Sequence, residues 1–207
     1  MSGRGPDILR AASLPAVPWK NGGGVTTEIA RHPRGDASLD FAWRISVARI
    51  ACDGPFSAYP GIDRTLAVVS GQGLSIEIEG AEPLVLSAAS APLAFPGELP
   101  VHARLSAGPV DALNVMTRRD LIRHAVLPVT QPIAHLLPTD VVAAVLVAPV
   151  GFVAVDGPDG GASIGLGPGD AAVFDPAADR LLGIRPLGGS HAWLVSMHRP
   201  TGHPGAG

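Results

Sequence analysis

The sequence predicts an all-β fold, because short alternating segments recur between turn residues along the chain. Residues 74–78 and 101–105 are two such segments, in which apolar side chains occupy every second position. The chain has 207 residues and is 46% apolar, which is enough for a substantial core. Its 26 glycines and 21 prolines interrupt the pattern too often for long helices.

An internal repeat divides the chain into two similar parts. The pattern of residues 66–80 is echoed by residues 145–157. A repeat unit of this length favours two jelly-roll barrels over a solenoid of short repeats. Charges and two prolines interrupt the pattern between positions 119 and 132. We therefore place one domain at residues 1–120 and a second at residues 121–207.

The first distinctive element is the run Trp-Lys-Asn-Gly-Gly-Gly at residues 19–24, which precedes a strand-like segment. Glycines let backbone N–H groups approach a ligand, while Trp19 offers a flat apolar wall and Lys20 a point charge. These properties indicate a binding corner. The alternative is a hairpin turn in which the glycines only satisfy turn geometry. The run is not a P-loop, because Lys20 precedes the glycines and no Gly-Lys-Ser/Thr follows.

The second element is the segment Phe-Ala-Trp-Arg-Ile-Ser-Val-Ala at residues 41–48. Its alternation places the large apolar side chains on one face of a strand, and Arg44 and Ser46 on the other. The remaining positions of the Arg44 face are small alanines, whereas an exposed strand face usually carries Thr, Lys or Glu. We therefore interpret the Arg44 face as the wall of a pocket.

Three later segments complete a set of separated motifs in a fixed order. They are Gly-Pro-Phe-Ser at residues 54–57, Asp-Arg at 63–64 and Asn-Val-Met at 114–116. Together with the glycine run and the Trp-Arg-Ile-Ser strand, these motifs resemble the HutD/Ves family. The resemblance covers most of the N-terminal two thirds of the chain, and beyond residue 119 it rests on hydrophobic pattern only.

The resemblance implies a bicupin, that is, two tandem cupin barrels of the RmlC-like jelly-roll type in one chain. It also implies an association with histidine utilisation and the binding of a metabolite of that pathway, with no established reaction. The barrel at residues 1–120 is expected to carry the ligand site. The barrel at 121–207 has almost no polar side chains over residues 141–166, so we expect it to be scaffold and to offer a homodimer surface.

Cupins commonly hold a metal through two or three histidines and a carboxylate. If Gly71 ends the second strand of that motif, the ligand positions fall near Ser57, Tyr59 and Arg64. The positive charge of Arg64 would repel a divalent ion, and the hydroxyl of Ser57 would bind such an ion poorly. His102 stands alone, and the other histidines form no short pair with ligand spacing. We therefore expect a pocket without metal or cofactor.

Such a pocket is suited to a small organic anion. Arginines offer planar, charge-assisted forks for a carboxylate, and aromatic rings can hold a flat ligand. The candidates for the ligand are urocanate, formylglutamate and formate. The alternative is that Asp63 neutralises Arg64 and Glu28 neutralises Arg44 as packed ion pairs. The predicted ligand-binding residues are Trp19, Lys20, Asn21, Arg44, Ser46, Phe56, Ser57, Arg64 and Asn114.

Two other functions stay open at this point. One is a metal-independent isomerase or lyase that acts on a small anion, with Tyr59 or His102 as acid or base. The other is a structural dimer module, in which side chains fill the Arg44 face. Hydrolase chemistry has little support, because no Gly-x-Ser-x-Gly elbow is present and the Ser190-His191 pair is interpreted as part of a loop. We favour a non-catalytic ligand-binding protein.

Composition bounds the partners and the compartment. A net charge of −3 and scattered Lys and Arg argue against nucleic-acid binding. The longest apolar run, at residues 141–150, is about half the ~20 residues that span a bilayer, so we expect a buried strand and no membrane contact. No signal-peptide pattern is visible. The single Cys52 fits a reducing cytoplasm.

Overall fold

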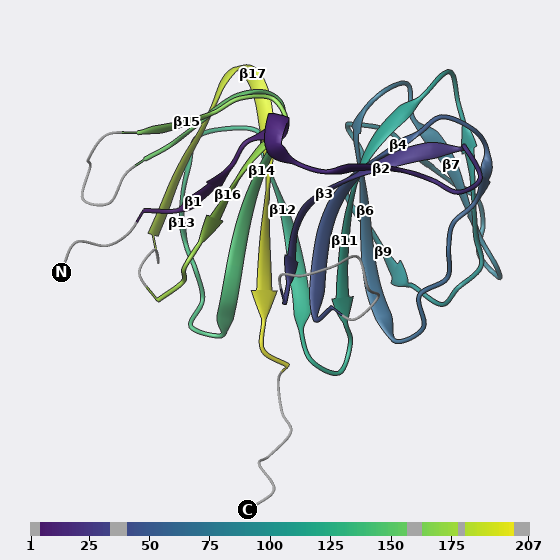
Figure 1. Cartoon of the computed structure of the whole chain (residues 1–207), viewed down its shortest axis with the longest axis horizontal. Coiled ribbons are helices and arrows are strands. Elements are labelled where there is room, and N and C mark those ends of the chain that lie inside the picture. The colour runs from purple at the N-terminus through teal and green to yellow at the C-terminus, as the bar shows by residue number, and fades with distance from the viewer. Residues whose placement is uncertain (1–4, 34–40, 157–162, 178–180, 201–207) are drawn as a thin grey trace, which may run out of the picture. The chain divides into compact units, whose positions relative to one another are not determined.

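The computed structural model describes residues 5–33, 41–156, 163–177 and 181–200 (Figure 1). Almost all regular structure in these ranges is β-strand, and the short 3-10 helix η1 (Ala11–Ser13) is the exception. The expected all-β class is therefore confirmed. The described residues form no helix long and apolar enough to cross a membrane. The chain divides into an N-terminal unit, Leu14–Leu121, and a C-terminal unit, which joins Met1–Ser13 to Ile122–Gly207.

The N-terminal unit consists of two antiparallel sheets. The larger sheet has the order β2-β3-β4-β11-β6-β9, and the smaller has the order β5-β10-β7-β8. The strands are β2 (Ala16–Pro18), β3 (Gly24–His32), β4 (Trp43–Ile50), β5 (Gly54–Pro55), β6 (Ile62–Ser70), β7 (Leu74–Ile78), β8 (Leu84–Leu86), β9 (Leu93–Pro96), β10 (Val101–Leu105) and β11 (Val110–Arg118). Strands β7 and β10 coincide with the alternating segments that predicted the fold.

Alternating side chains of both sheets build the core of the N-terminal unit. Ile50, Leu66 and Val68 of the larger sheet pack in one cluster with Leu74 and Ile76 of the smaller sheet. This cluster shows which face of each strand points inward, because successive side chains of a strand lie on opposite faces. The even-numbered residues of β4, β6 and β11 therefore face the interior between the two sheets.

The C-terminal unit is built around two long paired strands, β14 (Val141–Val155) and β17 (Leu181–His198). Residues 144–148 of β14 also pair with β16 (Asp170–Phe174), and residues 153–155 pair with β15 (Ile164–Leu166). Strand β17 pairs in turn with β12 (Arg123–Val129) and β13 (Ile133–Leu136). The apolar run expected to be a buried strand lies in β14, and its residues Ala144, Leu146 and Ala148 are buried in the core.

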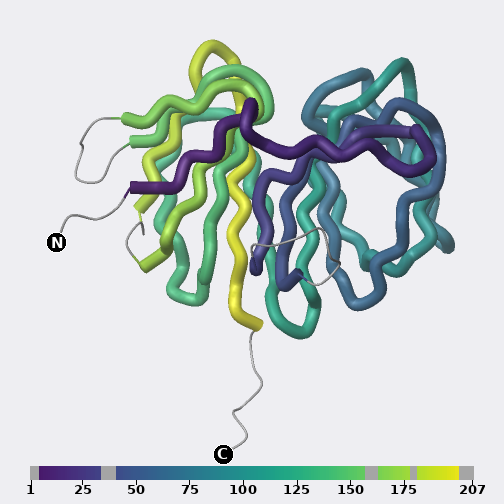
Figure 2. Tube along the Cα trace, viewed as in Figure 1, coloured from purple at the N-terminus to yellow at the C-terminus, as the bar shows by residue number. Residues whose placement is uncertain are grey.

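The first strand of the chain belongs to the C-terminal unit. Strand β1 (Asp7–Leu9) pairs antiparallel with β16 and runs beside it in Figure 2. Asp170 holds the following residues in place, because its carboxylate accepts hydrogen bonds from the backbone N–H of Ala11 (2.8 Å) and from Arg10 (2.6 Å). The same carboxylate accepts the N–H of Gly167 at 3.0 Å. The sequence places residues 1–120 in one domain, whereas the structure pairs β1 with a strand of the other unit.

These contacts make stability depend on the charge of Asp170. Burial raises the pKa of Asp170, but the N–H of Ala11, the Arg10 guanidinium and the N–H of Gly167 outweigh it, so the pKa lies below its usual 3.8. A carboxyl with a depressed folded-state pKa stabilises the fold above its unfolded pKa, and this contribution is lost as the pH falls through the folded pKa.

We expect Asp170→Asn to lower the free energy of unfolding at pH 7, and to lower it less as the pH falls below about 4. Urea unfolding between pH 7 and pH 2 measures this difference. Asp120→Asn is the matched control, since Asp120 is exposed and makes no hydrogen bond with a described residue. A difference between wild type and Asp170→Asn that stays constant over this pH range would contradict the role of the charge.

Candidate functional site

The interior face of the larger sheet changes from apolar to polar along its strands in the N-terminal unit. Ala48 and Ile50 of β4 lie in the core, so Arg44 and Ser46 continue the same inward face. The prediction that Arg44 and Ser46 share a face is therefore confirmed, and that face points between the two sheets. The opposite face, with Trp43 and Ile45, is also buried.

Cross-strand register gathers four of the predicted site residues on this face. Ser46 lies opposite Asn114 of β11, and Asn114 lies opposite Leu66 of β6. Met116, two residues further along β11, stands between Arg44 and Arg64. Ser46, Arg64 and Asn114 are buried. Residues that are distant in sequence thus form one polar cluster, which we call the Arg64 cluster: Arg44, Ser46, Arg64 and Asn114.

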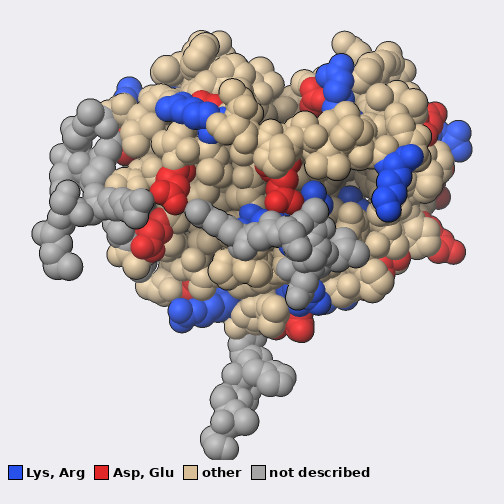
Figure 3. All heavy atoms as spheres, in the orientation of Figure 1, with Lys and Arg blue, Asp and Glu red and all other residues tan. Residues whose placement is uncertain are grey.

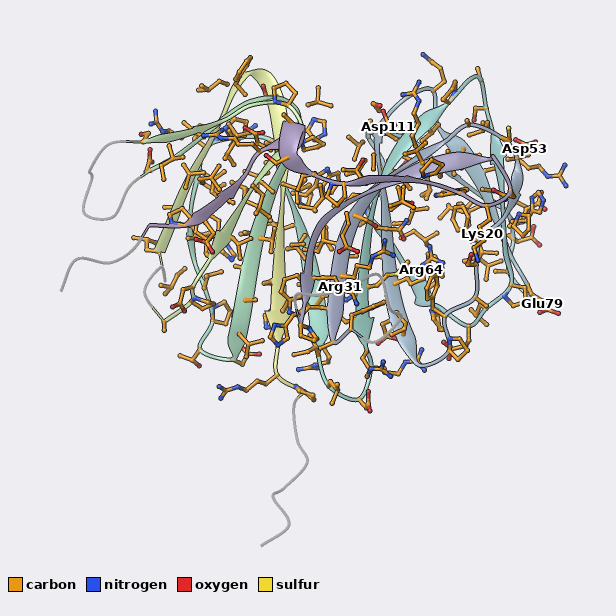
Figure 4. The ribbon with its side chains drawn as sticks, viewed as in Figure 1. Lys20, Arg31, Asp53, Arg64, Glu79 and Asp111 are labelled. Atoms are coloured by element: carbon orange, nitrogen blue, oxygen red, sulfur yellow. The ribbon has the colours of Figure 1, made fainter. Side chains whose placement is uncertain are left out.

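Arg64 is the centre of the cluster and is only 4% exposed. One of its Nη atoms donates to the side-chain oxygen of Asn114 at 3.0 Å, and the other donates to the carbonyl of Ser57 at 3.2 Å. Its Nε is buried and has no hydrogen-bond partner. None of the described residues pairs a carboxylate with Arg64. In Figure 4, Arg64 lies in the middle of the unit, whereas Asp53, Glu79 and Asp111 lie toward its margins.

Aromatic rings surround the guanidinium of Arg64. Its Cζ lies 5.4 Å from the ring centre of Phe56, 5.5 Å from that of Tyr59 and 5.1 Å from that of Phe95. These distances fall within the range of cation–π attraction. The rings contribute attraction to the cation, but they also keep water away from it, so they replace only part of its hydration.

The electrostatic consequence is that burial disfavours the charged form of the Arg64 side chain. Burial is the main cause that lowers the pKa of Arg64, to about 10, and the nearby charge of Arg44 lowers it further while Tyr59 raises it. The guanidinium is still charged at neutral pH. A base with a depressed folded-state pKa binds protons less readily in the folded chain than in the unfolded chain, so its charge opposes folding below that pKa.

Gly97 allows the backbone to approach Arg64 closely. Its N–H donates to the carbonyl of Ile62 at 2.7 Å, and its carbonyl accepts the N–H of Tyr59 at 2.8 Å. A Cβ at this position would lie 2.8 Å from the backbone oxygens of both Ile62 and Tyr59, and 3.2 Å from Cδ of Arg64. A larger residue would therefore displace the chain that carries Tyr59 and the aliphatic stem of Arg64.

Arg44 differs from Arg64, because it has an internal counter-ion. Its Nε donates to the carboxylate of Glu28 at 2.7 Å, and both side chains are partly exposed. This is the ion pair that the sequence left open as an alternative. Glu28 therefore neutralises Arg44 within the protein, as that alternative states. The corresponding pair of Asp63 with Arg64 does not form, since Asp63 binds Arg119 at 2.6 Å.

The glycine run forms the hairpin turn between β2 and β3. The side-chain oxygen of Asn21 accepts the N–H of Gly23 at 3.0 Å, which closes the turn locally. Gly24 lies under Trp19, because a Cβ there would meet the Trp19 ring at 3.1 Å and would also collide with the carbonyl of Arg49. The Trp19 indole donates to Thr26 at 2.8 Å and packs against the core. Lys20 and Asn21 are exposed, and Lys20 has no partner among the described residues.

The remaining sequence candidates divide between the interior and the surface. Phe56 and the Ser57 carbonyl contact Arg64, but the Ser57 side chain belongs to an exposed residue. Tyr59 also lies beside Arg64. His102 does not, because Val101 and Ala103 of the same strand face the core and His102 therefore points to the opposite face. The proposal of His102 as an acid or base inside the barrel is thus wrong.

Sequence reasoning missed Phe95 and Arg31. Phe95 lies opposite Arg64 in the β6–β9 register, and only the alternation of the short segment 93–96 hinted at its inward position. Arg31 is buried opposite Arg44, with its Cζ 5.9 Å from the Phe41 ring. In the described ranges, no three His, Cys, Asp or Glu side chains gather into a possible metal site. On the face shown in Figure 3, acidic and basic side chains are interspersed.

Comparison with known proteins identifies relatives of this chain. The family model described as HutD matches residues 11–188. An uncharacterized 21.2 kDa protein in the hutC 3′ region of Pseudomonas putida is 38% identical over 109 residues, which are 53% of this chain and 56% of that protein. Protein Ves of Citrobacter koseri is 40% identical over 108 residues, 52% of this chain and 55% of Ves. The matched stretch thus spans about half the length of these relatives.

Solved structures resemble most of the chain. HutD from Pseudomonas fluorescens SBW25, in a structure described as a formate condition, has a TM-score of 0.80 at 26% identity and covers 94% of this chain and 99% of that one. A conserved protein of unknown function from Pseudomonas aeruginosa PAO1 has a TM-score of 0.81 at 29% identity, with 93% and 98% coverage. The Lactobacillus farciminis oxalate decarboxylase formate complex, at 9% identity, has a TM-score of 0.60 over 95% of this chain and 86% of that one, which shows the fold alone.

The contrast between the two interior arginines is testable by stability. We expect Arg64→Met to leave the free energy of unfolding unchanged or to raise it, because it removes a buried cation that has no carboxylate partner. Arg44→Met removes the partner of Glu28 and should lower the free energy of unfolding by up to about 1 kcal/mol. Chemical denaturation of the ligand-free protein measures both. Strong destabilisation by Arg64→Met would show that Arg64 is a structural residue.

Proposed function

The chain belongs to the HutD family, and we propose that its N-terminal unit binds a small organic carboxylate at Arg64. One observation carries the proposal: Arg64 is buried, charged at neutral pH, and without a carboxylate partner among the described residues. Buried charges in proteins are normally paired. A ligand that brings the missing negative charge would complete the site.

Hydrogen-bond donors around Arg64 support a carboxylate in particular. The Nε of Arg64 has no acceptor. Asn114 uses its side-chain oxygen for Arg64, so its amide N–H groups remain as donors, and the Ser46 hydroxyl lies opposite Asn114. A guanidinium and neutral donors on one face match the two oxygens of a carboxylate. Arg44 lies close enough for its charge to act on Arg64, but Glu28 balances that charge.

The aromatic residues bear on the rest of the ligand. Phe56 and Tyr59 border Arg64 and are half-buried, so they extend from the interior toward solvent. Apolar rings at the edge of a charged site favour a flat or short organic group on the carboxylate. Urocanate has both features, and formylglutamate or formate would use the cation alone. The relatives found near hutC and in a formate condition are consistent with this choice.

The proposal extends to the architecture and the role. Each unit is a cupin barrel in our proposal, which makes the chain a bicupin that modulates histidine utilisation by binding a metabolite. Structures of cupin-like fold that cover most of the chain support this. A homodimer remains a prediction from the sequence.

A metal-independent isomerase or lyase is the second candidate. Tyr59 favours it, because its ring lies 5.5 Å from Arg64 Cζ and its hydroxyl is a possible proton-transfer group beside a bound anion. This reaction class predicts a product, whereas simple binding does not.

We expect calorimetry with urocanate, formylglutamate or formate to detect binding to the wild-type protein. Loss of one charge-assisted hydrogen bond costs roughly 1.5–3 kcal/mol, so Arg64→Met should weaken affinity by at least about ten- to a hundredfold. Lys20→Ala is the control that keeps affinity, since Lys20 is exposed in the hairpin turn.

Three outcomes would overturn parts of this proposal. Absence of heat with all three compounds removes the carboxylate site as proposed. Equal affinity in Arg64→Met places the ligand elsewhere. If ultraviolet absorbance shows that a bound compound is converted, and Tyr59→Phe abolishes this conversion, the result supports the isomerase or lyase function instead.

A further inference from the structure

The C-terminal unit contains a hydrogen-bonded chain of three functional groups, Ser196, His198 and Asp140. The Ser196 Oγ lies 2.8 Å from Nε2 of His198. The Nδ1 of the same ring lies 3.0 Å from a carboxylate oxygen of Asp140. A serine, an imidazole and a carboxylate in this order form the arrangement that activates a serine hydroxyl as a nucleophile.

Strand pairing explains how the three residues meet. Ser196 and His198 are two positions apart near the end of β17, so they share one face, which continues the core face of Ala192 and Leu194. Asp140 directly precedes β14, whose first residue lies opposite His198. The N–H of Arg199 also donates to the carbonyl of Asp140 at 3.0 Å, which ties the end of β17 to this turn. Figure 1 shows β14 and β17 side by side.

The hydrogen bonds define the proton positions in the neutral imidazole. The hydrogen bond from His198 is the main cause that lowers the pKa of Asp140, so the carboxylate is ionised at neutral pH. An ionised carboxylate can only accept, and the proton of His198 therefore lies on Nδ1. The Nε2 lone pair then accepts the Ser196 hydroxyl. The side chains of His198 and Asp140 are 18% and 43% exposed, so solvent reaches this hydrogen-bonded group of residues.

We infer that Ser196 is a nucleophile that activated carboxylic esters acylate. In the proposed step, a lone pair of Ser196 Oγ forms a bond to the carbonyl carbon while the hydroxyl proton moves to Nε2 of His198. The bond from this carbon to the leaving oxygen then breaks, and the leaving group takes the proton from His198. Water then attacks the acyl carbonyl while one of its protons moves to Nε2 of His198. The bond to Ser196 Oγ breaks, Oγ takes the proton from His198, and the carboxylic acid is released.

The position of Ser196 also predicts how the reaction is limited. Ser196 lies in a strand that pairs with β12 on one side and β14 on the other, so the nearby backbone N–H groups are engaged in the sheet. An oxyanion hole usually consists of such N–H groups. The charge of Arg123, opposite His198 on β12, also lowers the pKa of Asp140. Because the N–H groups that would hold an oxyanion are engaged, we expect one acyl group per chain to accumulate rather than rapid turnover.

The experiment uses the full chain and two reagents, a fluorophosphonate and p-nitrophenyl acetate. Intact mass and peptide mapping should show one adduct at Ser196, with fluoride or p-nitrophenolate released in equal amount. Replacement of a general base typically costs 10²- to 10⁴-fold, so His198→Asn should slow labelling by about a hundredfold or more. Asp140→Asn should slow it as well, because the neutral amide no longer favours the proton on Nδ1.

Ser163 provides the comparison within the same unit. Its hydroxyl is hydrogen-bonded to Asp156 and Arg185, without an imidazole. If the hydrogen bonds at Ser196 were only structural, the Ser196 hydroxyl would react no faster than that of Ser163. Lack of an adduct at Ser196 in the wild-type protein, or equal labelling in a folded His198→Asn variant, overturns the inference. Because Arg64 lies in the other unit, Arg64→Met should label at the wild-type rate.

Discussion

The buried guanidinium of Arg64 is the constraint on which the interior of the N-terminal unit depends. A cation at this depth is stable only if its hydration is replaced. Asn114 and the Ser57 carbonyl replace part of it by hydrogen bonds, and three aromatic rings contribute cation–π attraction. Gly97 keeps the backbone close enough for this packing. These groups are neutral, so they hold the charge in place without cancelling it. Under the proposed function, an anionic ligand would supply the cancelling charge, and function commonly opposes stability at such positions.

The two units place their polar groups differently. In the N-terminal unit, polar residues extend into the interior along β4, β6 and β11. In the C-terminal unit, the buried cluster is apolar, and Ser196 and His198 lie where the same strand face reaches its end. The sequence interpretation of the C-terminal part as scaffold rested on the lack of polar residues in 141–166. That lack agrees with the core, but Asp140 lies just before this segment and Ser196 and His198 lie well after it.

The fold and the inward faces were predictable because strand side chains alternate with a period of two. Residues 74–78, 101–105 and the Arg44 face follow from this alternation alone. The sequence left the pairing of charges open, because it depends on the register between strands. In the β3–β4 register Glu28 lies opposite Ser46, and its carboxylate reaches Arg44, two residues away on the same face of β4. Likewise, Phe95 and the pairing of β1 with β16 depend on contacts between distant segments, and β1 is only 3 residues long.

The central claim is that an anionic ligand supplies what Arg64 lacks, and nitrogen NMR of the arginine side chains tests it most directly. In protein with ¹⁵N-labelled arginine, the Nε–H signal of Arg64 is identified by its loss in Arg64→Met. This N–H has no acceptor in the structure. When urocanate is added, we expect this signal to shift and its hydrogen exchange to slow, with a smaller change at Arg44, whose Nε already donates to Glu28. An Arg64 signal that stays unchanged while urocanate saturates the protein would contradict the account.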